Sequence, residues 1–291
     1  MLQMVKNSLF AAVLLLLLSS CDKLDLKGLI MPTGDVVNER FEQSLSMHSD
    51  KPYSSVNVNE TYSFFVSTDP HVSDEGKNIK TFATKLRNDS DASFGIVLGD
   101  CIDKRGSMPV YLNAITFDAE EQEYNKPIYS IIGNHDLYFS GWNDFRDLVG
   151  PSVYSFEVNH TSGKDIFIAL DSGNGTHGSK QLQWLRNFLT SNRDKYRHCI
   201  VMTHTNFFYT DNSQNSSGNI PMEELMMLLN LFTDNDVTIC LQGHDHFRED
   251  LTFGGVRYTI VGTIRDEVEN PEYLCITLSD SGVEYEWKYI N

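Results

Sequence analysis

Polar side chains of the kind that bind metal ions follow five apolar segments of the chain. These segments run, in order, into Asp69-Pro70-His71, Asp100 with Asp103, Asn134-His135-Asp136, His204, and His244-Asp245-His246. In an open α/β sheet, sites form in the crevice beyond the carboxyl ends of the strands. We therefore expect all five groups of side chains to meet at one edge of the fold.

The residue types at these positions suit a divalent metal centre. Imidazole nitrogens and carboxylate oxygens bind borderline ions such as zinc, manganese and iron(II). The seven candidate ligands are Asp69, His71, Asp100, Asn134, His204, His244 and His246. They are too many for one ion, so the sequence predicts two ions with Asp100 between them. The alternative is a set of ordinary loop and capping residues, because motif matches carry a false-positive risk.

Three residues beside the candidate ligands could serve the site without binding metal. Gly133 is expected to let the backbone turn sharply before Asn134. His135 could donate a proton to a phosphate ester, or act only by stabilising negative charge. Asp103, one turn after Asp100, could hold the other nitrogen of His135 and set its tautomer, or simply cap a turn.

With these residues in order, the chain resembles the calcineurin-like metallophosphoesterases. The pattern of that family is D-x-H, G-D-x-x-D, G-N-H-[DE], a lone H, and G-H-x-H. Every element is present between Asp69 and His246, and the resemblance covers about residues 61–291. It implies an α/β fold with two packed mixed β-sheets flanked by helices, a four-layer α/β/β/α sandwich.

The resemblance also implies a role for each ligand. The first metal would be held by Asp69, His71, Asp100 and His246. The second would be held by Asp100, Asn134, His204 and His244. A water or hydroxide between the two ions, which would be Mn, Fe or Zn, would attack the phosphorus of a small phosphate ester.

The motifs do not decide between a phosphodiesterase and a phosphomonoesterase. Outside the enzymes, the alternative is a lipid-anchored binding module whose metal site is structural or inactive. The complete ligand set and the intact His135 favour the enzyme.

Three positions depart from particular branches of the family. The segment Asp100-Cys101-Ile102-Asp103 has no tyrosine, which disfavours the tyrosine-ligated iron(III) site of purple acid phosphatases. Lys104 stands where protein phosphatases carry an arginine, and lysine cannot give the bidentate fork to phosphate. Asn206 stands where many relatives have proline. A phosphoprotein substrate is therefore disfavoured.

The elements that must position these residues are short strands alternating with helical patterns. Strands are predicted at 62–68, 95–99, 127–132, 165–170, 199–203, 236–242, 257–262, 272–278 and 283–289. Apolar residues at helical spacing predict one helix from Ile79, a second around Leu182, and a third that starts at Pro221. Leu225, Leu228, Leu229 and Phe232 would form the buried face of the third helix. Strands mixed with helices in this way favour one layered α/β domain.

Some charged and aromatic residues near the motifs could have either a functional or a structural role. Lys104, Arg105, Arg248 and Arg265 could contact a substrate, but solvated surface charge is the simpler account. The long polar segment 205–220 carries Phe207, Phe208 and Tyr209, which could form an aromatic wall for a substrate or pack into the domain.

The N-terminus reads as a targeting segment. Leu9 to Leu18 is a run of ten apolar residues, too short to span a bilayer comfortably. It ends in Ser19-Ser20-Cys21, which resembles a bacterial lipoprotein signal whose cysteine becomes lipidated. An ordinary signal peptide or an uncleaved anchor is the alternative. We thus expect a signal peptide at 1–20, a tether and N-terminal extension at 21–60, and the metallophosphoesterase domain at 61–291, held in the bacterial cell envelope on a membrane by the lipid.

Charge and cysteine content narrow the functional classes. The formal net charge of −17 would repel nucleic acids and anionic membrane surfaces over most of the molecule. A phosphate substrate would therefore need local positive charge, which metal ions can supply. After Cys21, the cysteines are Cys101, Cys199, Cys240 and Cys275. They are expected to be buried free thiols, although export would permit disulfides, and without a CxxC pair a thiolate zinc site is not expected.

Overall fold

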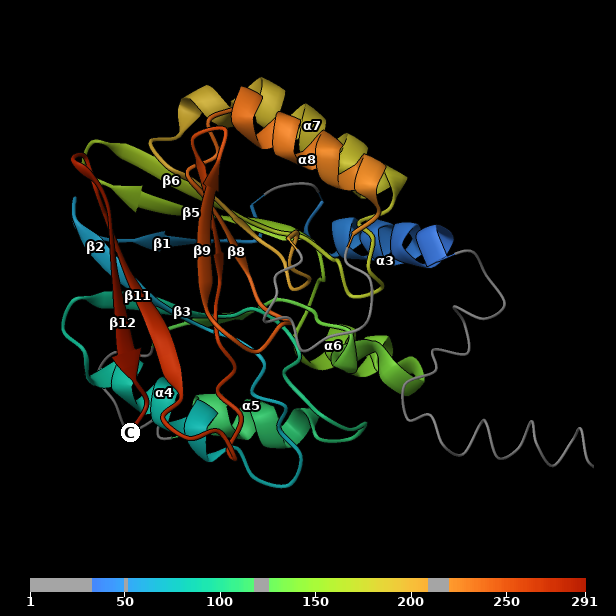
Figure 1. Cartoon of the computed structure of the whole chain (residues 1–291), viewed down its shortest axis with the longest axis vertical. Coiled ribbons are helices and arrows are strands. Elements are labelled where there is room, and N and C mark those ends of the chain that lie inside the picture. Colours follow the sequence, from blue (N-terminus) through green and yellow to red (C-terminus); the bar gives the residue numbers. More distant parts are fainter. Residues whose placement is uncertain (1–32, 50–51, 118–125, 209–219) are drawn as a thin grey trace, which may run out of the picture.

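A computed structural model describes residues 33–49, 52–117, 126–208 and 220–291 of the chain (Figure 1). The signal peptide, Cys21 and Tyr209 lie outside the described residues. The helices are α3 (Thr33–His48), α4 (Lys77–Asn88), α5 (Met108–Thr116), α6 (Trp142–Leu148), α7 (Ser179–Asn192) and α8 (Met222–Asp234). Short 3₁₀ turns form η1 (His135–Ser140) and η2 (Arg193–Lys195).

The larger sheet has seven strands in the order β1-β5-β6-β7-β8-β10-β9. Their bounds are β1 (Ser54–Asn57), β5 (Tyr154–His160), β6 (Gly163–Ala169), β7 (Cys199–Met202), β8 (Ile239–Gln242), β9 (Glu249–Phe253) and β10 (Val256–Ile260). Strands β6, β7, β8 and β10 are parallel, and hairpin partners extend this core on both sides. The central strands are buried on both faces, as parallel strands covered by helices usually are.

The smaller sheet has five strands in the order β12-β11-β2-β3-β4. Their bounds are β2 (Tyr62–Ser67), β3 (Ala92–Val97), β4 (Ile128–Ser130), β11 (Glu272–Ser279) and β12 (Gly282–Tyr289). Strands β2, β3 and β4 are parallel, whereas β11 runs antiparallel to both β2 and β12. The carboxyl ends of the three parallel strands therefore lie at the same edge of this sheet.

Three apolar layers hold the two sheets and their helices together. Between the sheets, Phe64 and Phe94 stack on each other and meet Phe156 and Phe167 from the other sheet edge-on. A second layer packs α4 and α5 on the smaller sheet, and a third packs α7 and α8 on the larger one (Figure 1). The structure thus confirms the predicted four-layer α/β/β/α sandwich.

The structure adds elements to those that periodicity predicted. Strands β1, β5 and β9 and helices α5 and α6 were not anticipated, while the nine predicted strands and three predicted helices are present with small shifts of their ends. The segment expected to be a tether and N-terminal extension, 21–60, contains two elements in its described part: residues 33–48 form α3, and residues 54–57 form an edge strand paired with β5. The ordered fold therefore begins well before residue 61.

Helix α3 is fastened to the domain by a buried ion pair. The Arg40 guanidinium donates from Nε and Nη2 to the two carboxylate oxygens of Asp171, at 2.7 and 3.0 Å. Both side chains are almost fully buried. Trp142 in α6 also donates to the Gln43 carboxamide of this helix, at 2.6 Å. The N-terminal extension is thus a structural part of the domain.

The remaining sequence predictions about the fold concern the cysteines and the membrane. The four cysteines after Cys21 are buried free thiols, as expected. Within the described residues, no helix has the length and apolar character needed to cross a bilayer.

Candidate metal centre

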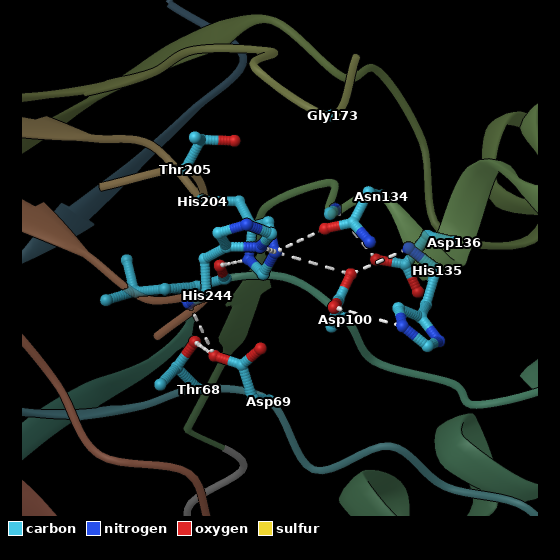
Figure 2. A network of polar contacts seen from close by, with 12 residues as sticks. Thr68, Asp69, Asp100, Asn134, His135, Asp136, Gly173, His204, Thr205 and His244 are labelled. Carbon is cyan, nitrogen blue, oxygen red and sulfur yellow. Dashed lines mark hydrogen bonds and ion pairs between the residues drawn. The ribbon is translucent and has the colours of Figure 1, made fainter. Parts of the chain in front are cut away.

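The side chains predicted to bind metal converge where β2, β3, β4, β7 and β8 end. Figure 2 shows five of them: Asp69, Asp100, Asn134, His204 and His244. They form two groups, each with ligand atoms within 4.8 Å of one another: Asp69 with His71 and His246, and Asp100 with His204 and His244. The Asn134 carboxamide joins the second group, because its Oδ1 lies 3.0 Å from His204 Nε2. The structure therefore brings all seven candidates together.

The first group presents its donor atoms to a common point. The Nε2 atoms of His71 and His246 lie 3.2 Å apart and 3.6 and 3.3 Å from Asp69 Oδ1. Asp69 Oδ2 accepts hydrogen bonds from Thr68 Oγ1 and from the backbone N–H of His244. Asp69 Oδ1 is buried and has no hydrogen-bond partner, which leaves it available to a cation.

In the second group, a backbone carbonyl group orients the ring of His204. His204 Nδ1 lies 2.8 Å from the carbonyl oxygen of Leu98 and donates to it, which leaves Nε2 as the ring nitrogen that would bind a metal ion after losing its proton. His204 Nε2 faces His244 Nδ1 at 3.2 Å and Asp100 Oδ1 at 3.4 Å. Nitrogen and oxygen lone pairs that crowd one point in this way fit a bound cation.

Asp100 lies between the two groups. Its Oδ1 faces His204, and its Oδ2 lies 3.6 Å from His71 Nε2. The backbone N–H of His135 donates to Oδ1 at 2.8 Å and holds the carboxylate in this orientation. Asp100 therefore occupies the position that a bridging ligand requires.

The backbone is strained at most of the candidate ligands. Five of them have left-handed φ values between 43° and 75°: Asp69, His71, Asp100, His244 and His246. Such conformations cost roughly 1–3 kcal/mol each in non-glycine residues and are typical of functional sites. The fold keeps them because the turns after β2, β3 and β8 aim these side chains at one centre.

Gly133 is needed for space rather than for a turn. A Cβ atom there would lie 2.2 Å from both the backbone nitrogen and Oδ1 of Asp100, so only glycine lets the two loops approach. Asp136 fastens the same contact, because its buried carboxylate accepts the N–H groups of Gly133 and Ile102. Close approach of the two loops is thus a reason for glycine that the sequence did not indicate, and the hydrogen bonds of Asp136 were not foreseen either.

Asp103 lies between two histidines instead of serving His135 alone. Its Oδ1 is 3.6 Å from Nδ1 of His135 and 3.4 Å from Nδ1 of His71. His135 itself points toward Asp100, with 4.0 Å between Nε2 and Oδ2. The predicted contact therefore exists as a loose electrostatic one, and the same carboxylate also orients a candidate ligand.

The electrostatics of the cluster are those of closely packed acids and imidazoles. Burial alone would raise the pKa values of Asp69 and Asp100, but neighbouring histidines, above all His204, lower both below their usual range. Burial opposes the charged ring of His71 and of His204, yet the surrounding carboxylates raise their pKa values to about 10 and about 9. In the metal-free protein, the rings of His71 and His204 therefore carry protons where metal ions would bind.

Two histidines of the cluster behave in the opposite way. Burial, with the His204 charge beside it, lowers the pKa of His244 to about 4. Burial is also the main reason why the pKa of His135 falls below its usual value. Both rings are therefore neutral at pH 7, and His135 can offer an N–H donor without carrying charge.

The structure decides some of the open readings near the site. Phe207 is buried against Phe232, so this ring belongs to the core and not to a substrate wall. Phe208 packs edge-on against Tyr258. Lys104 and Arg248 each pair with an acidic neighbour and, like Arg105, are exposed, as expected of surface charge. Arg265 pairs with Glu267 at 2.8 Å and also lies 3.9 Å from Asp103, beside the first group of ligands. Tyr138, whose hydroxyl accepts the Asn134 amide at 2.9 Å, was not found from sequence.

The four layers and the paired acid–histidine groups define the class of protein. The sequence model of the calcineurin-like phosphoesterases matches residues 62–248, and the chain belongs to this family. The two groups fit the pair of divalent ions that is typical of the family. No curated protein sequence matches the chain.

Solved structures share the fold at low sequence identity. GAP50, the anchor in the inner membrane complex of Plasmodium, is 15% identical, with a TM-score of 0.62 over 79% of this chain and 85% of that one. A dimetal phosphatase from Danio rerio is 13% identical, with a TM-score of 0.58 over 79% of this chain and 99% of that one. A purple acid phosphatase from seeds of yellow lupin (Lupinus luteus) is 14% identical, with a TM-score of 0.56 over 80% of this chain and 52% of that one.

Proposed function

We propose that this chain is a phosphoesterase that hydrolyses a small phosphate ester with two divalent metal ions, of manganese, iron or zinc. The observation that carries the proposal is Asp100, whose two carboxylate oxygens face separate groups of ligands. When bound, two such ions lower the pKa of a water molecule and neutralise phosphoryl oxygens.

The residues of the chain divide the remaining work. Asp69, His71 and His246 would hold one ion, and Asn134, His204 and His244 the other, with Asp100 shared. His135 lies at the edge of the pair, 17% exposed and neutral, so its N–H can donate to the charge that develops on the phosphate or the leaving oxygen. Asp103 keeps that ring and the ring of His71 in place.

The surroundings explain why metal is required. A pocket of about 310 Å³ beside the first group is lined by Pro70, His71 and Ser73, by one guanidinium, that of Arg265, and by five carboxylates. These are the carboxylates of Asp74, Glu75, Asp103, Asp266 and Glu267. A phosphate dianion would be repelled from this wall unless cations were bound next to it. The chelated protein should therefore be inactive.

Substitution of the bridging carboxylate tests the proposal. Asp100→Asn and His135→Ala should each abolish the hydrolysis of aryl phosphate mono- and diesters that the manganese-loaded chain performs. Lys104→Ala, on the exposed Asp74 pair, is the matched control and should keep activity. If Asp100→Asn turned over as fast as the natural chain, the dinuclear mechanism would be refuted.

A binding module remains the second candidate, since one structure with this fold is described as an anchor. Such a module would bind metal or a partner without turnover. Absence of hydrolysis on both esters, with both ions shown to be bound, would favour it.

We also propose that the protein is exported and anchored to a membrane of the bacterial cell envelope through a lipid on Cys21. The support is the apolar run that ends in Ser19-Ser20-Cys21. Mass spectrometry of the native protein should find a modified Cys21 at the N-terminus. An intact Met1 or an unmodified Cys21 would refute the anchor.

A further inference from the structure

Tyr138 contacts the candidate metal centre from the turn that follows it. It lies in η1, and its hydroxyl accepts a hydrogen bond from Asn134 Nδ2 at 2.9 Å. The other end of the same carboxamide, Oδ1, faces His204 Nε2 at 3.0 Å. The amide of Asn134 is thus held at both ends, and its oxygen points toward the second group of ligands.

The orientation of this amide matters because only its oxygen can bind a metal ion. The NH₂ end is a donor and would repel a cation if the amide turned over. Among the described residues, Tyr138 provides the hydrogen-bond acceptor for that NH₂ end. The phenol keeps its proton, because burial raises the pKa of Tyr138 above its usual value. In the observed arrangement the hydroxyl accepts from the NH₂ end, while the oxygen of the same amide lies 3.0 Å from His204 Nε2 in the second group.

The ring of Tyr138 also contacts His135. The two ring centroids lie 4.7 Å apart with an interplanar angle of 49°. The side chain is half-buried, so this contact excludes part of the solvent from the imidazole. One residue therefore touches both Asn134, a candidate ligand, and His135, the candidate donor.

The backbone beyond Tyr138 is built to keep it there. Phe139 and Ser140 follow with φ values of 53° and 68°, two consecutive left-handed residues that are not glycine. Gly141 comes next, and a Cβ there would lie 2.2 Å from the carbonyl oxygen of Asp136. The turn thus carries backbone strain, which persists only where the surroundings enforce it.

We propose that Tyr138 is a positioning residue for the second metal ion, acting through the amide of Asn134. Its part in catalysis rests on the proposed function, whereas its effect on metal binding can be measured separately. Hydrogen-bond partners behind a metal ligand typically contribute about 10- to 100-fold in affinity. Removal of the Tyr138 hydroxyl should therefore weaken the second ion by that factor and leave the first unchanged.

The experiment is a calorimetric titration of the metal-free chain with Mn²⁺, comparing the natural chain with Tyr138→Phe. The variant keeps the ring and its contact with His135, so the unfolding temperature should not move. Tyr289→Phe, which removes the hydroxyl of a 58% exposed tyrosine far along the sequence on β12, is the matched control and should titrate like the natural chain. The double variant Asn134→Ala/Tyr138→Phe should bind the second ion no more weakly than Asn134→Ala alone, because both act on one ligand.

Equal affinities for the second ion in Tyr138→Phe and the natural chain would overturn the inference. So would additive losses in the double variant, because Tyr138 would then act independently of Asn134. A natural chain that binds two ions but cleaves neither a monoester nor a diester would refute the proposed function, and the titration would still decide the role of Tyr138.

Discussion

Replacing Arg40 by methionine should strongly destabilise the whole domain, although Arg40 belongs to the extension before residue 61. The guanidinium makes two hydrogen bonds to Asp171, and the two side chains are only 4% and 0% exposed. Methionine fills similar volume but leaves the Asp171 carboxylate buried. Within the part of the chain that the structure describes, the backbone N–H of Gly173, at 3.2 Å, then remains to donate to that carboxylate.

The expected loss of unfolding free energy follows from the burial of the Asp171 carboxylate. Removing one partner of a buried ion pair typically costs about 3–5 kcal/mol, because an uncompensated charge stays inside. Against a total unfolding free energy of about 5–15 kcal/mol, this is a large share. Urea unfolding of the metal-free chain, followed by tryptophan fluorescence, measures it. Trp184 packs 6.0 Å from Phe41 of α3, and Trp142 donates to Gln43, so both indoles report on this helix.

Lys180→Met is the matched control for Arg40→Met. Lys180 also pairs with α3, through Glu42, but those side chains are 51% and 57% exposed. An exposed pair contributes about 0–1 kcal/mol, so this variant should unfold almost like the natural chain. If Arg40→Met lost less than about 1 kcal/mol, the claim that α3 is an integral part of the domain would be wrong.

Three further predictions concern protons and packing. Manganese affinity should rise as pH increases toward about 9, because His71 and His204 must lose their protons to bind metal. Their pKa values in the metal-free protein are about 10 and about 9. An affinity that does not change between about pH 7 and about pH 9 would contradict this. The pKa of Glu224 is lowered, because the His177 contact at 2.6 Å outweighs burial, so its stabilisation is present above the unfolded-state pKa and disappears as pH falls through the folded-state pKa. Glu224→Gln should therefore destabilise the chain in urea at pH 7, and the loss should shrink as pH falls below the usual glutamate range; a loss that does not change with pH would refute the assignment. Phe207→Ala should lower the unfolding free energy by about 3–5 kcal/mol, as expected of a core ring. A loss below about 1 kcal/mol would contradict the core assignment and favour the alternative that Phe207 faces a substrate.

The convergence of the candidate ligands could be predicted from sequence because each group follows a strand whose direction is fixed by the sheet. Asp69 and His244 are far apart in the chain, yet the ends of β2 and β8 place them in hydrogen-bond contact. The types and order of the residues were therefore enough to predict which side chains converge, and the structure adds the distances between them.

Other features depend on tertiary contacts that no local pattern contains. Helix α3 has few apolar residues, and its place is set by the pair of Arg40 with Asp171, 131 positions apart. Strand β9 is largely exposed, so it lacks the apolar alternation that marks a strand. Tyr138 could not be singled out, because its role depends on the strained turn at Phe139 and Ser140.

The central claim is that the two groups of ligands perform hydrolysis with two metal ions. The most direct test is to load the purified full chain with Mn²⁺, count the bound ions, and assay an aryl phosphate monoester beside the matching diester, with and without EDTA. We expect two ions per chain and hydrolysis of at least one ester that EDTA abolishes. Two bound ions without hydrolysis of either ester, or hydrolysis that survives complete metal removal, would contradict the account.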